Sequence, residues 1–226
     1  TRNDYGLNVN DDTPLFLLAL YHHAAVTRDV QFLRRVYPYV RRAAQYLLSQ
    51  MQDDLVVCTS RGTNVHGIAG WRNIIPAFTL SGAVTELNAE CCAALLRCAQ
   101  MARAVGAQED ADRWEQAAGR LRQAIHRELV SPRTGLYALA RGLDGELFDP
   151  ITADMVFPLL FDVAEPEMRK RVEQRLLSPE FWSEHGARTV GRDQPEYDPD
   201  AGSQLLGGVW PNLTAWIAYA ARSEEH

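Results

Sequence analysis

Two glutamates spaced one helical turn apart are the first feature of the sequence that could do chemistry. Glu86 and Glu90 open an apolar segment that follows Thr85, which we interpret as a helix N-cap. Residues four positions apart share one face of a helix, so both carboxyl groups should point the same way. Carboxylates at a helix start beside a long loop are typical of an active-site rim. The helix dipole alone also favours glutamate there, so a structural role stays open.

The loop that leads into this helix carries side chains suited to a polar ligand. Glycines and a proline interrupt any helical period between Gly67 and Gly82. Trp71, Arg72 and Asn73 lie inside it and can stack on a ligand or hydrogen-bond to it. A tryptophan in a loop can also be a packing anchor, so both interpretations are kept.

A second long loop, from Ser178 to Gly208, is rich in proline, glycine and aspartate. Loops of this length in a compact domain are usually functional or disordered, and its aromatic residues argue against disorder. Glu184 and His185 lie within it, and Trp210 follows it. We consider Trp210 equally suited to a stacking platform and to the core.

Apolar periodicity predicts seven helices around these loops. They are expected over residues 13–25, 30–51, 86–105, 109–130, 154–163, 166–177 and 209–222, with a small hairpin around residues 143–145. The first, third, fifth and seventh are apolar nearly all round, and the others are amphipathic. The alternation predicts an all-α fold of sequential antiparallel hairpins, with the odd helices inside and the even helices outside.

In such an array the N-termini of the inner helices meet at one end. Asp12, Asp154 and the two long loops should then lie together, where the helix dipoles gather partial positive charge. Asp12 and Asp154 could also be simple caps, because helix caps are usually polar.

Composition narrows the class of protein. A chain of 226 residues is enough for a single domain over its whole length, and a net charge of −6 argues against nucleic-acid binding. The cysteines lack zinc spacing and are interpreted as small buried residues in a reducing compartment, so we expect no metal, no cofactor and a cytoplasmic location: Cys58, Cys91, Cys92 and Cys98. We see no signal peptide and no apolar run of membrane-spanning length.

Four segments, in this order, resemble the (α/α)6 toroid glycoside hydrolases: NDDTPLFLLALYHH, GWRNIIP with TELNAE, SPEFWSEHGARTV with PEYDP, and GGVWPNLTAWIAYA. Amylo-α-1,6-glucosidase and glycogen debranching proteins are the most similar, with trehalases and processing α-glucosidases as cousins. The resemblance implies a saccharide-binding funnel and inverting hydrolysis of an α-glucosidic bond in an oligosaccharide or polysaccharide by two carboxyl groups. Seven helices would form only part of a toroid, so we expect a fragment whose exposed flanks could be covered by self-association.

The resemblance also gives the candidate site. Asp12 resembles the sugar-binding aspartate of the family, and Trp71, Arg72 and Asn73 resemble the loop that lines its subsite. Our candidate catalytic carboxyl groups are Glu86 and, in the second loop, Glu184. The other candidate substrate-binding residues are Asn88, Asp154 and Trp210. The relatives have an aspartate after the Gly-Trp pair, where this chain has Arg72 and Asn73. A carbohydrate-binding or helical scaffold module without catalysis is therefore the alternative.

Overall fold

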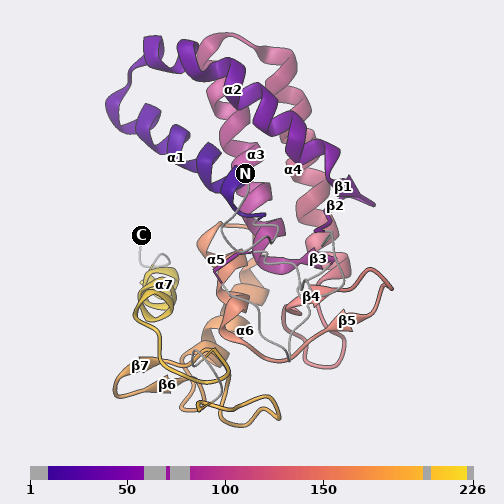
Figure 1. Cartoon of the computed structure of the whole chain (residues 1–226), viewed down its shortest axis with the longest axis vertical. Helices are drawn as coiled ribbons and strands as arrows, with labels where there is room; N and C mark the ends of the chain where they lie inside the picture. The colour runs from indigo at the N-terminus through magenta and orange to yellow at the C-terminus, as the bar shows by residue number, and fades with distance from the viewer. Residues whose placement is uncertain (1–9, 59–69, 72–81, 201–204, 223–226) are drawn as a thin grey trace.

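The computed structural model describes residues 10–58, 70–71, 82–200 and 205–222. Its described part contains seven α-helices and one 3₁₀ helix (Figure 1), and the prediction of an all-α fold is confirmed. The helices are α1 (Asp12–Thr27), α2 (Val30–Ser49), α3 (Thr85–Val105), α4 (Gln108–Glu128), η1 (Ala153–Val156), α5 (Phe157–Leu160), α6 (Pro166–Leu176) and α7 (Pro211–Arg222). No helix in these ranges is both long enough and apolar enough to cross a membrane.

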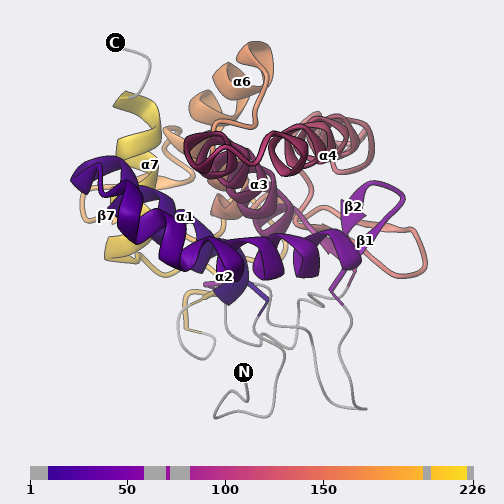
Figure 2. The same ribbon diagram turned by 90° about the horizontal axis from the view of Figure 1, so that it is seen from above.

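Helix α3 is the centre of the fold. It contacts α1, α2, α4 and α5, and every residue from Thr85 to Leu95 is buried. Figure 2 shows α3 between its neighbours when the molecule is seen from above. Alanine, cysteine and leucine make up most of this enclosed stretch, and Gly106 ends the helix in the left-handed conformation, with φ of 84°. The prediction of an inner third helix is confirmed.

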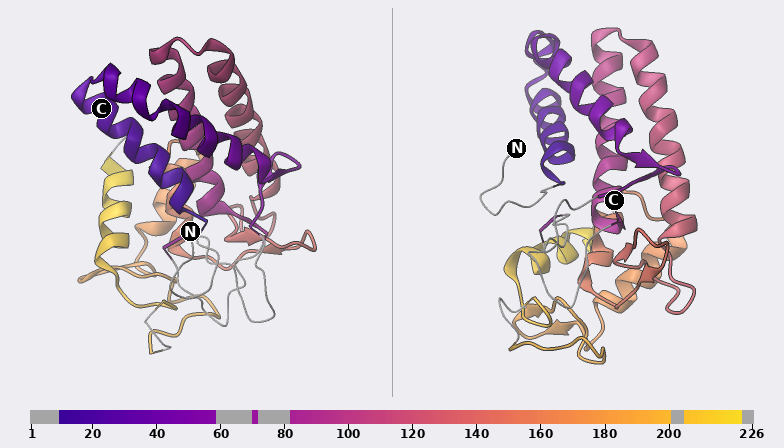
Figure 3. Two further views of the ribbon diagram at one scale, coloured as in Figure 1. Left: turned by 45° about the horizontal axis from the view of Figure 1, so that its top comes forward. Right: turned by 45° about the vertical axis from the view of Figure 1, so that its right-hand side comes forward.

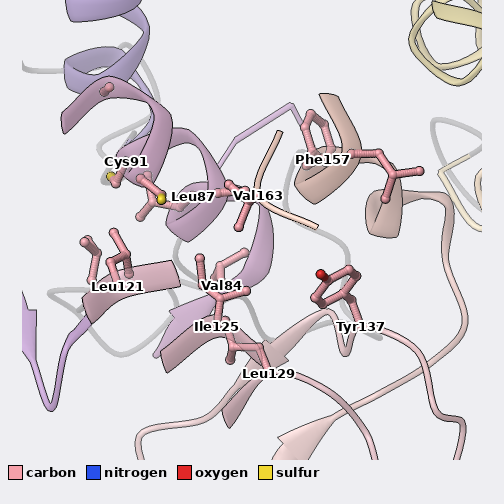
Figure 4. Packing of buried hydrophobic residues seen from close by; sticks show 14 of the residues in the cluster. Val84, Leu87, Cys91, Leu121, Ile125, Leu129, Tyr137, Phe157 and Val163 are labelled. Carbon is pink, nitrogen blue, oxygen red and sulfur yellow. The ribbon is translucent and has the colours of Figure 1, made fainter. Parts of the chain in front are cut away.

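The α3–α4 pair forms the largest part of the core. Leu121, Ile125 and Leu129 pack with Val84 and Leu87 (Figure 4). The four cysteines are free and buried, as expected from their apolar surroundings. Their thiols serve here as small hydrophobic groups that let the helices approach closely.

The amphipathic helices follow the predicted pattern. Helix α2 buries Leu33, Val40, Ala44 and Leu47 along one stripe. Its N-cap is Asp29, whose carboxylate accepts a hydrogen bond of 2.8 Å from the backbone N–H of Phe32. Helix α4 likewise buries one face and exposes its charged face.

The first helix differs from the prediction. We expected it to be buried all round, but α1 buries only Pro14 and Leu17. Leu15, Phe16 and Val26 are 42%, 47% and 69% exposed. Within the described chain α1 is packed by α2 and α3, and it lies with α7 on the side of the molecule away from α4 (Figure 3), so its outer face has no covering layer there.

The seventh helix was also expected to be an inner helix, but α7 buries only Leu213, Ile217 and Ala220, and Tyr219 is 69% exposed.

Two further details of the predicted helices were wrong. Thr85 is not a cap: it is the first residue of α3, and its hydroxyl donates to the carbonyl of Ala138 at 2.6 Å. The fifth helix does not extend from Asp154 to Val163 as one α-helix. Pro158 has no N–H to bond to Asp154, so the segment begins as η1 and becomes α-helical only over α5.

Short antiparallel strands connect the helices at the end where α3 begins. One hairpin is β1 (Met51–Gln52) with β2 (Leu55–Val56), and a second is β6 (Trp182–Ser183) with β7 (Gly186–Ala187). A three-stranded sheet has β3 (Ala83–Val84) at one edge, then β4 (Ala140–Arg141) and β5 (Leu147–Phe148). The β4–β5 pair is the predicted hairpin, and β3 leads directly into α3.

Asn88 fixes the start of α3 to the first hairpin. Its side chain is fully buried; Oδ1 accepts from the Val56 N–H at 2.7 Å, and Nδ2 donates to the carbonyls of Val56 and Val84 at 2.9 and 2.8 Å. The backbone N–H and C=O of Val56 in β2 therefore both bond to the side-chain amide of Asn88.

We predict that Asn88→Ala lowers the free energy of unfolding by about 1–3 kcal/mol, the cost of leaving a buried backbone group unpaired. Urea denaturation followed by circular dichroism measures the change. The matched control is Asn212→Ala, since Asn212 is exposed in the first turn of α7. Equal denaturation midpoints for the two variants would contradict the structural role of Asn88.

Candidate functional site

Trp71 joins the starts of two helical elements. Its backbone N–H donates to Glu86 Oε1 at 3.2 Å, at the first turn of α3. Its indole Nε1 donates to Asp154 Oδ1 at 3.0 Å, in the first turn of η1. Glu86 and Asp154 are 4% and 2% exposed, so both carboxyl groups lie in the interior. We call Trp71, Glu86, Asp154 and Trp210 the Trp71 cluster.

Aromatic contacts bring the start of α7 to the same place. The Trp71 ring meets the Trp210 ring edge to face, with centroids 5.9 Å apart, and the Trp216 ring at 6.0 Å. Trp216 in turn packs on Phe157 of α5, with centroids 5.4 Å apart. Three elements far apart in the sequence therefore contribute their N-terminal ends to one group of polar and aromatic side chains.

Gly70 lets the chain approach Glu86 closely. A Cβ at this position would lie 2.2 Å from Glu86 Oε1 and 2.3 Å from the carboxyl carbon. These separations are far inside van der Waals contact, so any side chain would displace the carboxylate. The glycine before Trp71 is thus required by the geometry of the acidic group.

More acidic groups lie behind Glu86. Burial raises the pKa of Glu90 well above its ordinary value, and the nearby charges of Glu86 and Asp11 raise it further. Burial also raises the pKa of Asp11. Burial, with Glu86, Asp11 and Glu90 nearby, raises the pKa of the Cys58 thiol to about 12. These groups favour their neutral forms because charge cannot be solvated there.

Two oxygen atoms in this acidic group are buried without a hydrogen-bond partner in the part of the chain that the structure describes: Glu90 Oε2 and Asp11 Oδ1. A buried carboxyl group with a raised pKa can hold a proton near neutral pH and give it to a bound molecule. The site therefore combines buried carboxyl groups, two of which have raised pKa values, with aromatic rings.

The structure brings together four of the predicted site residues in the Trp71 cluster. Asp12 lies in the first turn of α1, but its side chain is exposed, and its neighbour Asp11 is the residue close to Glu90. Arg72 and Asn73 lie outside the described residues. Asn88 is enclosed, and its amide is used by the backbone of Val56 and Val84, so its environment does not support the predicted substrate contact.

Glu184 is in a different part of the structure. It lies in the turn of the β6–β7 hairpin, and its side chain is 85% exposed. Its Oε1 is 3.3 Å from Nε2 of His185. It lines a cavity of about 660 Å³, which we call the hairpin cavity, together with Trp182, His185, Arg188 and Tyr197. No member of the Trp71 cluster lines this cavity, although Val209, the residue before Trp210, does.

Sequence reasoning missed Asp11 and Trp216. Asp11 was passed over in favour of its neighbour Asp12, and only the start of the helix decides which of the two turns inward. Trp216 was assigned simply to an apolar helix. Its position about one and a half turns into α7, on the side that carries Leu213 and Ile217, was the available signal.

We predict that Glu90→Gln stabilises the folded chain at neutral pH. A carboxyl group whose pKa is raised on folding contributes full stability below its ordinary value of 4.5, and this is lost as the pH rises toward the raised value. The glutamine has no such loss, so its advantage should shrink as the pH falls toward 4.5. Denaturation midpoints between pH 4 and 8 test this with Glu146→Gln, at an exposed site, as control; a pH-independent difference would contradict it.

Comparison with known proteins agrees with the fold. The mannosylglycerate hydrolase from Thermus thermophilus, solved in complex with glucose, superimposes with a TM-score of 0.71 at 16% identity, over 97% of this chain and 63% of that one. A rhamnosidase of Bacillus sp. GL1 gives 0.65 at 26% identity, over 77% and 18%. A rhamnosidase from Klebsiella oxytoca with rhamnose bound gives 0.63 at 15%, over 96% and 36%.

This chain spans less than two thirds of the length of each of these structures. No curated protein sequence matches it significantly. The model of the mannosylglycerate hydrolase MGH1-like glycoside hydrolase domain matches residues 80–225, which include α3 and every later element. Because this match covers more than half of the chain, the chain belongs to the family of MGH1-like glycoside hydrolase domains.

Proposed function

We propose that the chain forms the substrate-binding face of a glycoside hydrolase that cleaves α-glucosidic bonds with inversion. The observation that carries the proposal is the Trp71 cluster, in which buried carboxyl groups and tryptophans meet at the N-terminal ends of α3, η1 and α7. Inversion uses one carboxylic acid to protonate the leaving oxygen and one carboxylate to activate water. The membership of a glycoside hydrolase family supports the reaction class.

Glu86 is our candidate for the general acid. It is buried, and its carboxylate accepts a hydrogen bond from the backbone N–H of Trp71. Trp210 is only half-buried, and its ring can stack on the apolar face of a sugar. Asp154 holds the Trp71 indole in place, which keeps the backbone N–H of Trp71 directed at Glu86.

Glu184, the predicted second carboxyl group, lines the hairpin cavity, which no member of the Trp71 cluster lines. An inverting mechanism needs both carboxyl groups beside one glycosidic bond, so we do not propose Glu184 as the base that acts with Glu86.

A second candidate function is saccharide binding without hydrolysis. The specific observation in its favour is the sequence Gly70-Trp71-Arg72-Asn73, because neither arginine nor the asparagine amide can donate a proton as a general acid. Binding of maltose or isomaltose by calorimetry, together with the absence of any glucose release, would favour this alternative.

We predict that Glu86→Gln reduces glucose release from α-glucosides by about 10²–10⁴-fold, the range for losing a general acid. Saccharide affinity should change far less, because the amide keeps the size of the side chain. The matched control is Glu109→Gln, since Glu109 is an exposed glutamate in the first turn of α4. Turnover by Glu86→Gln at the wild-type rate would remove Glu86 from the mechanism.

We predict that Gly70→Ala also lowers kcat, because its methyl group must displace the Glu86 carboxylate. Gly119→Ala serves as control: a Cβ there meets nothing within 4 Å, and alanine is favoured in a helix. The control should retain full activity and equal or higher stability. A Gly70→Ala variant with unchanged kcat would show that the position of Glu86 does not limit the reaction.

A further inference from the structure

The hairpin cavity has a wall that carries two arginine side chains close together. Arg192 Nη2 donates to the carbonyl oxygen of Pro179 at 3.3 Å, and Arg188 Nη1 lies 3.5 Å from the same oxygen. Two guanidinium groups within reach of one oxygen atom place two positive charges side by side. Each guanidinium has five N–H donors, so most of them remain for other acceptors.

Neither arginine forms an ion pair with a carboxylate among the described residues. Other arginines of the described chain are compensated in this way, such as Arg133 by Asp149 and Arg175 by Asp193, with N–O distances of 2.8 and 2.7 Å. The guanidinium groups of Arg188 and Arg192 bond to a backbone carbonyl instead. Adjacent uncompensated guanidinium groups favour an anion, and carboxylate suits their planar geometry.

Backbone hydrogen bonds fix the segment that carries the two arginines. The N–H groups of Arg188 and Arg192 donate to the carbonyls of Phe181 and Glu180 at 2.8 and 3.1 Å. On the opposite side, the Thr189 N–H donates to Gly208 at 3.1 Å, and the Gly207 N–H donates to Thr189 Oγ1 at 2.8 Å. The arginine-bearing segment is therefore fixed on both sides before any ligand arrives.

Two aromatic side chains complete the lining. Trp182 and Tyr197 are both half-buried against the core. Gly207 has φ of 144° and carries no side chain, and a Cβ there would lie 2.5 Å from the Tyr197 ring. The ring is therefore seated on the Gly207 backbone. Such rings bind the apolar face of a sugar, while Glu184 and Asp200 on the rim can accept hydrogen bonds from hydroxyl groups.

We propose that the hairpin cavity is a second saccharide-binding site, selective for a sugar ring that carries a carboxylate, such as a uronic acid residue. The guanidinium groups of Arg188 and Arg192 bind the carboxylate, and Trp182 and Tyr197 contact the ring. The choice of a saccharide rests on the proposed function, whereas the selectivity for a carboxylate rests on the arginine pair alone.

The experiment is a calorimetric titration of the full chain with glucuronic acid, glucose and inorganic phosphate. Glucuronic acid should bind, glucose should bind at least about tenfold more weakly, and added salt should weaken the glucuronic acid affinity. Arg188→Gln and Arg192→Gln should each lower that affinity about tenfold or more, as expected for the loss of a charge-assisted hydrogen bond. Arg171→Gln is the matched control, because Arg171 is exposed and bonds to backbone carbonyls of Glu167 and Gly135.

Other outcomes overturn the proposal. Equal affinity for glucose and glucuronic acid would remove the role of the arginine pair. Phosphate that binds as tightly as glucuronic acid, with Tyr197→Leu leaving both affinities unchanged, would indicate a general anion site. Because binding is measured without turnover, and can be repeated in Glu86→Gln, loss of hydrolysis leaves this result unaffected. If glucuronic acid does not bind in the hairpin cavity, the Glu86→Gln experiment still tests the proposed hydrolase activity.

Discussion

The hydrogen bonds of Trp71 are the interaction on which the site depends. Its backbone binds Glu86 and its indole binds Asp154, so one residue fixes the relative positions of α3 and η1. Both acceptors are buried, where a missing donor is costly, and the two bonds therefore specify a single arrangement. The rings of Trp210 and Trp216 close around the indole and bring α7 to the same point. Trp71 contacts residues at the starts of α3, η1 and α7, and so brings these three helix starts together in one site.

Electrostatics explains why this site is unusual within its own fold. Glu86, Glu90 and Asp11 lie close enough for their charges to interact, in a region where burial already disfavours charge. A structural core would avoid this arrangement, because each buried carboxyl group reduces stability. The positive ends of the helix dipoles offset part of the cost at the start of α3. Proteins commonly keep such costly groups where they perform chemistry.

Much of the architecture could be predicted from periodicity. The apolar sequence of α3 and the striped sequences of α2 and α4 define an inner helix and two outer helices, and Asp29 and Gly106 mark helix ends by their own chemistry. The first helix was predicted less well. Its composition indicates burial, but burial depends on a covering neighbour, which local sequence does not encode. Helix α5 is short because Pro158 has no N–H to donate to the preceding turn. The prediction followed the apolar pattern of the segment and did not take this missing donor into account.

The site was predictable in its location and only partly in its members. Polar segments before the inner helices indicated that Asp12, Asp154 and the residues of the two long loops would meet. Trp71, Glu86, Asp154 and Trp210 do meet, whereas Asp12 and Glu184 lie apart from them. Sequence spacing could not show that the side chain of Asn88, in the first turn of α3, forms its hydrogen bonds with the backbone of β2. Nor could it show that Asp11 lies nearer to Glu90 than Asp12 does. Such distinctions depend on side-chain direction at a helix start, which is set by the neighbouring chain.

The burial of the cysteines has a practical consequence. Burial raises the pKa of the Cys58, Cys91, Cys92 and Cys98 thiols above the ordinary range. Only a thiolate reacts readily with maleimides or oxidants, and these groups are both protonated and enclosed. The four natural cysteines are therefore expected to react little with covalent labelling reagents. A single cysteine introduced on the surface can carry a fluorophore or spin label without first replacing the natural ones.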